Sequence, residues 1–524
     1  MIIKLVILFL VSALTKVQTA KILAVFPTPS ISHQVVFRKI TQELVNRGHA
    51  VTVITPDPAY DKDQSPSNLK EIDVHDISYG IWKKIMAEAF KVNENNVSKF
   101  KEMRLASLVL FHVFAAQIQT PEVEKLISNK DNTFDLLYIE AVILPALVFS
   151  HIFKAPVILV SSFGALFNSN DLIGSPSHPI LYPSNLNRRL YNLTLMEKIS
   201  TIYNHFSIQY ANYLNKIDET ALLKQILGPD IPSISELYNN VDMFFVNVHP
   251  IWTDNQPVPP GVVYMGGIHQ LEEKELPKDL KLYLDSSKHG VIYVSFGTNV
   301  LAGMIPTKKI EIISNVLSKL PYDVLWKWDK DELPGKADNI KLSKWLPQSD
   351  LLRHPKILLF ITQAGLQSTD EAITAGVPLV AIPMLGDQWY NAEKYVKHGI
   401  GVNLDINTFS TEDFRNAVEE IINNKRYREN IIKLRTVMRD QPETAIQRVV
   451  WWTEYVLRHG GAKHLRAPEA NISYYEYLEI NVVIVVFLVF LILLSLFVIL
   501  CVYVFNFIGR LMKYKQTHSS KKIN

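Results

Sequence analysis

Short, mostly apolar runs alternate with longer amphipathic segments along most of this chain. Helical patterns separate many of the runs, among them 34–47, which ends at Gly48, and 366–375, which ends before Gly376 and Pro378. The alternation predicts two α/β domains built from βαβ units. The run 357–362 is apolar without gaps, as is typical of a strand buried on both faces of a parallel sheet. The predicted strands lie at 21–26, 50–54, 134–141, 156–161, 243–248, 291–298, 323–328, 339–343, 357–362 and 379–382.

Two further apolar stretches lie at the ends of the chain. Residues 1–20 combine one Lys, a short apolar centre and small residues near Ala20, which predicts a cleaved signal peptide. Residues 482–505 are almost continuously apolar, and a run of about 24 residues is long enough to cross a bilayer. The tail beyond Arg510 carries lysines and no acidic residue, so it should be cytosolic, as in a single-pass type I protein whose main part is luminal.

Seven segments follow from these patterns. The interdomain linker is placed where Pro and Gly concentrate, because these residues mark turns and loops. The segments are a signal peptide (1–20), an N-terminal domain (21–256), the linker (257–277), a C-terminal domain with terminal helices (278–460), a juxtamembrane segment (461–480), a transmembrane helix (481–507) and a basic tail (508–524). The last four residues, Lys521 to Asn524, resemble the dilysine retrieval signal of endoplasmic-reticulum membrane proteins, although an ordinary basic tail is the alternative.

Composition narrows the function classes. The 524 residues include 54 Lys and Arg against 51 Asp and Glu, so nothing indicates nucleic-acid binding. The single cysteine, Cys501, allows no intrachain disulfide and no cysteine-based metal site. Asn-X-Ser/Thr sequons at Asn96, Asn192 and Asn471 precede the apolar run, and they predict glycosylation of a luminal segment.

The stretch 345–388 has the pattern of a nucleotide site. An apolar strand, a small-residue turn and a helix follow one another, so the helix N-terminus should lie at the carboxyl edge of the sheet, where it can bind phosphate. Gln367, Ser368 and Glu371 lie within one turn and should share a face, on which the carboxylate suits a ribose diol. Upstream, Trp345 offers a flat face for a base and Gln348 a donor and an acceptor; a core Trp and a capping Gln are the alternative.

The ordered run from Trp345 to Gln388 closely resembles the signature of the UDP-glycosyltransferases, which include UDP-glucuronosyl- and UDP-glucosyltransferases. The resemblance extends over nearly the whole mature chain. It implies a GT-B fold, in which two Rossmann-like domains face each other across a cleft, together with a C-terminal membrane anchor. The implied UDP-sugar-binding residues are Ser295, Thr298, Trp345, Gln348, Gln363, Gly365, Gln367, Ser368, Glu371, Asp387 and Gln388.

The resemblance also distributes roles among these residues. It implies that Trp345 stacks on uracil, that Gln348 contacts uracil or ribose, and that Glu371 binds the ribose hydroxyls. Ser295, Thr298 and Ser368 are the implied diphosphate ligands, whereas Asp387 and Gln388 are the implied ligands of the donor sugar.

One departure from the family pattern concerns the turn before the helix. Many members have His-Gly-Gly or His-Cys-Gly where this chain has Gln363-Ala364-Gly365, a variant that invertebrate-type members resemble. Gln can donate a hydrogen bond to phosphate but carries no charge. The leaving diphosphate should therefore depend more on the helix N-terminus and on Ser368.

His33 is the candidate general base. It follows the first strand, at the sheet edge where open α/β folds bind their ligands, and an imidazole there can take a proton near neutral pH. We place it on the loop before the helix, where a capping or merely polar histidine is the alternative. The resemblance puts the family's catalytic histidine at this position. Its partner is predicted to be Glu140, since Asp135 falls at the start of its strand, away from the carboxyl edge.

These residues predict an inverting, metal-independent transfer of a sugar from a UDP-sugar to a hydroxyl of a small lipophilic acceptor. Glucose is the expected sugar by analogy with the Gln363 variant, and glucuronic acid is the alternative. Residues 79–130 are mostly helical and either line the acceptor pocket or form core. No cofactor is expected: Asp329 with Asp331, and Asp61 with Asp63, match the Asp-X-Asp metal motif of another glycosyltransferase class, but so short a motif is more often a solvated turn.

Two other function classes stay open at this point. The changed Gln363 and Glu140 are compatible with a non-catalytic member that binds UDP as part of a binding partner. A single-span receptor for small lipophiles is disfavoured, because a receptor has no use for a nucleotide site. Membrane lipid is an expected partner, and a homo-oligomer is compatible with a sequence that does not determine the oligomeric state.

Overall fold

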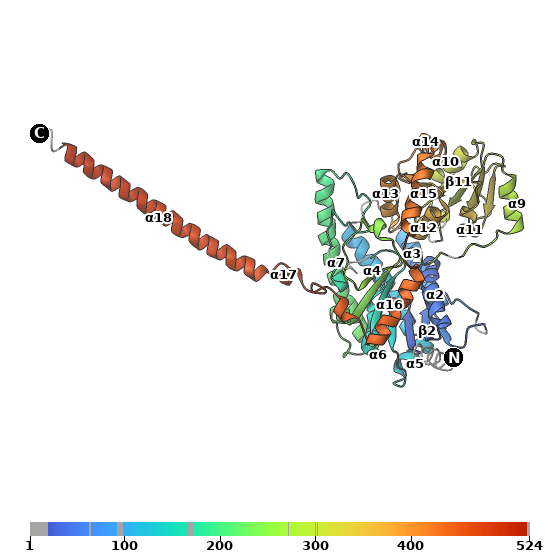
Figure 1. Ribbon diagram of the computed structural model, residues 1–524, viewed down its shortest axis with the longest axis horizontal. Coiled ribbons are helices and arrows are strands. Elements are labelled where there is room, and N and C mark those ends of the chain that lie inside the picture. Colours follow the sequence, from blue (N-terminus) through green and yellow to red (C-terminus); the bar gives the residue numbers. More distant parts are fainter. Residues whose placement is uncertain are drawn as a thin grey trace, which may run out of the picture. The chain divides into compact units, whose positions relative to one another are not determined.

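The computed structural model describes residues 19–61, 64–91, 98–165, 171–175, 177–270, 272–298, 300 and 302–520. The predicted signal peptide is therefore almost wholly outside the described residues, as are Asn96 and Asp63. The chain forms two compact units, Met1–Ala470 and Asn471–Asn524. The larger unit contains two sheets flanked by helices (Figure 1).

The first sheet is parallel throughout and has the order β3-β2-β1-β4-β5-β6-β7. Its strands are β1 (Lys21–Val25), β2 (Ala50–Thr55), β3 (Leu69–Asp73), β4 (Leu136–Glu140), β5 (Val157–Ser161), β6 (Val241–Val246) and β7 (Val262–Tyr264). The direction of winding reverses between β1 and β4, which pair from Ile22 with Leu136 to Val25 with Ile139. Open α/β sheets bind their ligands at such a reversal.

The second sheet repeats this topology with the order β10-β9-β8-β11-β12-β13, again parallel throughout. Its strands are β8 (Val291–Ser295), β9 (Asp323–Lys327), β10 (Ile340–Ser343), β11 (Ile357–Thr362), β12 (Leu379–Ala381) and β13 (Gly401–Asn403). The reversal here lies between β8 and β11. The two predicted Rossmann-like domains are thus confirmed.

Helices cover both faces of the two sheets. The helices of the larger unit are α2 (Ile31–Asn46), α3 (His75–Lys91), α4 (Lys99–Ile118), α5 (Pro121–Ser128), α6 (Val148–Phe153), α7 (Leu195–Leu227), α8 (Ile234–Leu237), α9 (Lys278–Ser286), α10 (Thr307–Leu317), α11 (Gln348–Leu352), α12 (Leu366–Ala375), α13 (Gln388–His398), α14 (Thr411–Asn423), α15 (Arg426–Arg439) and α16 (Ala445–His459). Short 3₁₀ helices are η1 (Leu144–Leu147), η2 (Asp171–Ile173), η3 (Tyr238–Asn240), η4 (Pro250–Thr253), η5 (Ala302–Met304) and η6 (Lys463–Leu465).

The side chains of alternate residues in a central strand pack into two different hydrophobic cores, one on each face of the sheet. In β1, Ile22 and Ala24 pack on the side of α2 and α16, whereas Leu23 and Val25 belong to the core under α4 and α5. Both sets are buried, because a parallel strand covered by helices on both faces has no solvent side. This explains why the strands appear in the sequence as nearly continuous apolar runs.

The chain returns to the first domain at its end. Helix α16 packs beside α2 and β7, although these elements lie far apart in the sequence (Figure 1). Val449 and Val456 of α16 join the first domain's core, and Thr453 hydrogen-bonds the hydroxyl of Tyr138 on β4. Arg47 and Glu454 add an ion pair of 3.2 Å between α2 and α16.

Two sequence-based assignments need adjustment. The predicted linker, 257–277, includes β7, so the first sheet extends into it. The prediction that His33 lies on a loop is wrong: α2 already begins at Ile31, and Ser30, in an extended conformation, is its N-cap. His33 therefore occupies the first turn of α2, where its backbone N–H donates to the Ser30 carbonyl at 2.9 Å.

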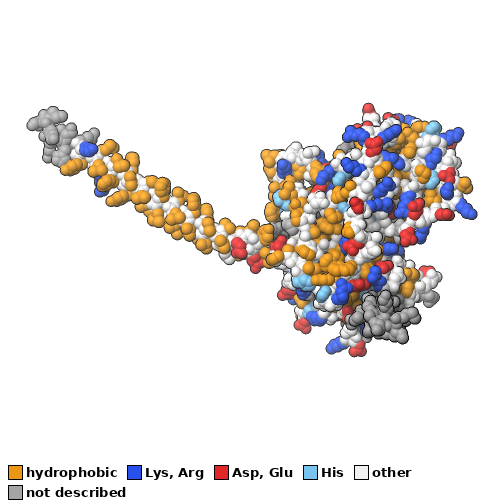
Figure 2. Space-filling view, viewed as in Figure 1, with side chains coloured by type: hydrophobic (Ala, Val, Ile, Leu, Met, Phe, Trp, Pro, Cys, Tyr) orange, Lys and Arg blue, Asp and Glu red, His pale blue; other side chains and the backbone are white. Residues whose placement is uncertain are grey.

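The smaller unit contains α17 (Tyr474–Tyr477) and α18 (Ile480–Ser520). Within the described part of the chain, the segment Ile480–Lys515 of α18 is the one helix long and apolar enough to cross a membrane. Its surface is hydrophobic almost throughout (Figure 2). This helix could serve as a membrane anchor, as a bilayer core about 30 Å thick needs about 20 apolar residues.

Candidate active site

His33 and Glu140 meet at the reversal between β1 and β4. His33 Nδ1 lies 2.7 Å from Glu140 Oε1, and the second carboxylate oxygen accepts the backbone N–H of Thr28 at 3.0 Å. Glu140 is completely buried, whereas the His33 side chain keeps 14% of its surface exposed. Phe163 contacts the imidazole in a T-shaped arrangement, with 5.3 Å between the two ring centroids.

This geometry can select a histidine tautomer. An ionised carboxylate only accepts hydrogen bonds, so Nδ1 facing it should carry the proton. The lone pair is then on Nε2, which can accept a proton from a ligand. A histidine oriented by a carboxylate in this way is the arrangement of a general base.

Gln348 connects three residues of the second domain. Its side-chain N–H group donates to Ser368 Oγ at 2.9 Å and to Glu371 Oε2 at 2.7 Å, and its oxygen accepts from the hydroxyl of Tyr293 at 2.9 Å. Burial raises the pKa of Glu371 to about 7, although the Gln348 hydrogen bond acts in the opposite direction. Ser368 and Glu371 thus share one face, as predicted, and Gln348 is oriented toward α12.

Trp345 presents its ring to solvent with 66% of the residue exposed, which excludes the alternative of a core tryptophan. The ammonium of Lys327 lies 4.8 Å from the centroid of this ring and donates to the Gly297 carbonyl at 3.0 Å. Burial lowers the pKa of Lys327, against the effect of Asp329. A flat exposed ring backed by a cation can bind a nucleobase by stacking.

The ends of β8 and β11 approach each other closely. Gly297 has φ +76°, a left-handed conformation that favours glycine, and a Cβ added there would displace the end of the Gln363 side chain, whose nitrogen lies 2.2 Å from that position. Gly365 is the N-cap of α12, while the left-handed residue of the turn is Ala364, with φ +66°. Ser295 is buried and its hydroxyl accepts the Gly297 N–H at 3.4 Å.

The N-terminus of α12 faces the first domain. Gln367 donates from its side chain to the Ser32 carbonyl in the first turn of α2. Gln367 thus lies one turn before Glu371 on α12, as predicted, but its side chain bonds the first domain and not Gln348. Thr298 lies exposed beyond β8, on the loop between Gly297 and Val300.

Asp387 and Gln388 begin α13, and both are held in place by hydrogen bonds. The Gln388 oxygen accepts the backbone N–H groups of Met384 and Leu385 at 2.8 and 2.7 Å. Burial raises the pKa of Asp387, while its hydrogen bond from Asn391 and the nearby charge of His33 oppose the shift. Asp387 and His33, from different domains, are thus close enough to interact electrostatically.

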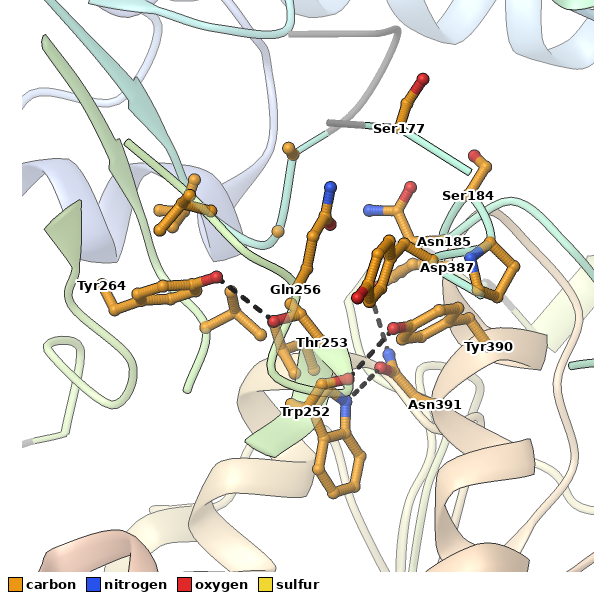
Figure 3. A pocket seen from close by; sticks show the side chains of 18 of the residues that line it. Ser177, Ser184, Asn185, Trp252, Thr253, Gln256, Tyr264, Asp387, Tyr390 and Asn391 are labelled. Atoms are coloured by element: carbon orange, nitrogen blue, oxygen red, sulfur yellow. Dashed lines mark hydrogen bonds between the residues drawn. The ribbon is translucent and has the colours of Figure 1, made fainter. Parts of the chain in front are cut away.

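Asn391 connects Asp387 to the first domain. It donates to Asp387 Oδ2 at 2.9 Å and accepts the indole N–H of Trp252 at 2.8 Å (Figure 3). A cavity of about 100 Å³ adjoins this contact. Its lining combines apolar and polar side chains of both domains, including His205, Val246, Val248, Tyr264, Leu366 and Tyr390.

A second contact between the domains is ionic. Asp254, next to η4, accepts from Lys394 of α13 at 2.6 Å and from the hydroxyl of Tyr191 at 2.8 Å, and Lys397 also donates to it. The side chain of Lys394 is completely buried, and burial lowers its pKa to about 8 despite the Asp254 partner.

Sequence reasoning missed Lys327, Tyr293 and Asn391. Asn391 could have been found, because it lies four residues after Asp387 on one helix face. Lys327 carried no such signal, since a lysine at a strand end is usually solvated. Its position becomes evident only when β8 and the Trp345 loop are placed beside it.

The remaining sequence candidates lie on the surface. Asp331 is exposed and pairs with Lys344 at 2.8 Å. Asn192 is exposed, with φ +53°, and Asn471 is partly exposed. Among the described residues, no group of three or more His, Cys, Asp or Glu side chains could hold a metal ion.

Comparisons with known proteins agree with this architecture. The family model described as "UDP-glucoronosyl and UDP-glucosyl transferase" matches residues 20–517. An ecdysteroid UDP-glucosyltransferase of Lymantria dispar multicapsid nuclear polyhedrosis virus is 35% identical over 490 residues, covering 90% of this chain and 94% of that protein. UDP-glucosyltransferase 2 of Dactylopius coccus is 32% identical over 486 residues, covering 92% of each chain.

A solved structure extends the likeness to the fold. The UDP-glucosyltransferase of Polygonum tinctorium that glucosylates indoxyl matches with a TM-score of 0.56 and 15% identity, covering 85% of this chain and 100% of that one. Two Rossmann-like domains with this likeness form the GT-B fold. The chain belongs to the family of UDP-glucuronosyl and UDP-glucosyl transferases, and it is a glycosyltransferase.

Proposed function

We propose that this enzyme transfers glucose from UDP-glucose to a hydroxyl of a small lipophilic acceptor, with inversion and without a metal ion. The observation that carries the proposal is the His33–Glu140 pair, which lies beside the hydrogen bond from Gln367 of the second domain to the Ser32 carbonyl. A base on one domain would thus face the sugar-binding end of the nucleotide site on the other.

In the proposed reaction His33 Nε2 takes the proton of the acceptor hydroxyl. The hydroxyl oxygen then bonds to the anomeric carbon while the bond from that carbon to the UDP oxygen breaks, and UDP leaves from the opposite face. The N-terminus of α12, together with Ser295, Thr298, Gln363 and Ser368, would stabilise the diphosphate with preorganised dipoles in place of a metal. Asp387 and Gln388 would hold the sugar.

Donor and acceptor are proposed by different routes. Several relatives are named UDP-glucosyltransferases, which favours glucose over glucuronic acid. The name of the viral relatives makes an ecdysteroid the first acceptor to test. The mixed apolar and polar lining of the cavity beside Asp387 suits such a hydroxylated lipophile.

We further propose that α18 anchors the enzyme in the endoplasmic-reticulum membrane with the catalytic domains luminal. The apolar length of α18 and the basic residues after it support this orientation. The dilysine-like end of the chain, outside the described residues, supports the compartment.

The test is a microsomal assay with UDP-glucose or UDP-glucuronic acid, an ecdysteroid and a panel of phenols, in the presence of EDTA. His33→Ala should lower kcat by roughly a hundredfold or more, as expected for a general base. His112→Ala, an exposed histidine on α4, is the matched control and should leave kcat unchanged.

Three results would change the proposal. Transfer from UDP-glucuronic acid alone would correct the donor. Loss of activity with EDTA would refute the metal-free mechanism. UDP binding without turnover for any acceptor would indicate a non-catalytic member.

A further inference from the structure

Helix α7 is apolar on two opposite sides. One side packs against α4 and is buried through Ile208, Ala211 and Leu223. The other side is exposed: Tyr213 follows Ala211 by two positions and Tyr210 follows Ile208 by two, so each points about 200° around the helix from its buried neighbour. The exposed apolar residues are Leu195, Met196, Ile199, Ile202, Tyr203, Phe206, Tyr210, Tyr213 and Ile217, hereafter the α7 stripe.

The α7 stripe is too large for an ordinary soluble surface. Its members are each between 40% and 73% exposed. With about 200 Å² for a large apolar side chain, the stripe exposes on the order of 1,000 Å², whereas soluble proteins rarely expose apolar patches above a few hundred Å². Figure 2 shows these hydrophobic side chains along the edge that α7 forms on the larger unit.

We infer that the α7 stripe lies in the lipid bilayer surface, as a second membrane contact besides α18. This inference rests on the proposed membrane anchor. Only residues 471–479 separate the larger unit from α18, and a segment of that length reaches at most about 30 Å. The anchor would therefore keep the larger unit, which carries the α7 stripe, close to the lipid surface.

The composition of α7 favours lipid over a protein partner. The stripe contains three tyrosines, and amphipathic aromatic rings prefer the level of the lipid headgroups. The charged residues of the same stretch, Glu197, Lys198 and Lys216, lie about 100° or more around the helix from the middle of the stripe. Lys198 and Lys224 are exposed near its two ends, where long side chains can reach the headgroups while their stems stay in the apolar layer. An interfacial helix of this kind immerses its apolar face in the boundary between headgroups and acyl chains.

The position of the stripe has a consequence for the acceptor. His205 of α7 lines the cavity beside Asp387, one residue from Phe206 of the stripe. A lipophilic acceptor dissolved in the bilayer would therefore approach this cavity from the membrane side. Partitioning into lipid would raise its local concentration at the enzyme.

The experiment uses the full-length enzyme with a protease site inserted between Ala470 and Asn471, reconstituted in phosphatidylcholine vesicles. After cleavage in high salt, which screens surface charges, we expect most of the larger unit to sediment with the vesicles. The stripe variant Ile199→Ser/Phe206→Ser/Tyr213→Ser should release most of it. The control Leu282→Ser/Val396→Ser/Val437→Ser removes equally exposed apolar residues elsewhere and should behave like the parent.

A second measurement does not depend on releasing the protein. In a Cys501→Ser background, an environment-sensitive fluorophore on Ile199→Cys should be quenched by nitroxide-labelled lipid after cleavage, whereas the same label on Leu282→Cys should not. Retained UDP binding checks the fold of each variant.

Each other outcome overturns the inference in a distinct way. If the cleaved parent leaves the vesicles, α7 has no membrane contact. If the uncleaved chain fails to sediment, the proposed anchor itself is wrong. If detergent-solubilised parent forms dimers that the stripe variant loses, the stripe binds a second copy of the chain instead of lipid.

Discussion

Replacing Glu140 by Gln tests whether His33 acts as a base. The buried carboxylate accepts two donors, the His33 ring nitrogen at 2.7 Å and the Thr28 N–H at 3.0 Å. A Gln side chain has one oxygen, and the Thr28 backbone can only donate. Turning the amide NH₂ of the side chain in this variant toward the Thr28 N–H would bring two buried donors face to face, which costs about 1–3 kcal/mol of folding free energy. The amide oxygen should therefore stay at Thr28.

This orientation reverses the histidine tautomer. The NH₂ group of Glu140→Gln would donate to His33 Nδ1, so the ring proton moves to Nε2, where it blocks the lone pair that must accept the substrate proton. The expected loss in kcat is the full contribution of a general base, about 10²–10⁴-fold, or roughly 3–5 kcal/mol of transition-state stabilisation. The affinity for UDP should not change, because Glu140 lies in the other domain.

The assay compares kcat, the KM for UDP-sugar and the Kd for UDP in Glu140→Gln, Glu140→Asp and the parent. Glu140→Asp keeps the carboxylate with a shorter reach, so its loss in kcat should be smaller. A purely structural role for Glu140 would instead weaken UDP binding and thermal stability together. If Glu140→Gln turns over within a few fold of the parent while remaining folded, the base assignment is refuted.

Three further predictions concern the second domain and its contact with the first. Trp345→Ala should weaken UDP binding by about 1–3 kcal/mol in calorimetry, the range for base–aromatic stacking, whereas the exposed Trp451→Ala should not. The raised pKa of about 7 keeps Glu371 partly protonated at neutral pH, whereas ribose hydroxyls donate to the ionised carboxylate. The Kd for UDP should therefore rise as the pH falls below 7. In Glu371→Gln, the pH dependence that comes from Glu371 should disappear, and only the titration of UDP itself should remain. Asp254→Asn should lower the free energy of unfolding by about 3–5 kcal/mol, because Lys394 stays buried without its carboxylate partner. Adding Lys394→Met to this variant should restore much of the lost stability. An unchanged melting temperature in Asp254→Asn would contradict a stabilising role of the ionic contact.

The elements that the sequence predicted best are those buried on all sides. Strand β11 and helix α12 have the predicted bounds, because continuous apolar residues mark the strand and Gly376, in the left-handed conformation with φ +76°, ends the helix. Strand β3 was missed for the opposite reason. It has polar residues at Lys70, Glu71 and Asp73, as an edge strand with one solvated side often does.

Spacing in the sequence predicted those parts of the candidate site whose residues lie on a single helix. Ser368 and Glu371 could be placed together from helical spacing alone. Gln367 could not, since its partner Ser32 is 335 residues away and only the approach of the two domains decides where its side chain points. The pairing of His33 with Glu140 was predicted through the family resemblance and is confirmed. Helical spacing could not have given it, because it depends on the strand order that places β1 beside β4.

Because α16 returns to the first domain, that domain is not one continuous stretch of the sequence. The first domain consists of two pieces of chain, one that runs through β7 and one from about Ala445 onward. A chimera that exchanged only the continuous N-terminal piece would place Val449 and Val456 against a foreign core and would remove the Tyr138 partner of Thr453. Specificity engineering in this enzyme therefore has to transplant α16 together with the sheet that it covers.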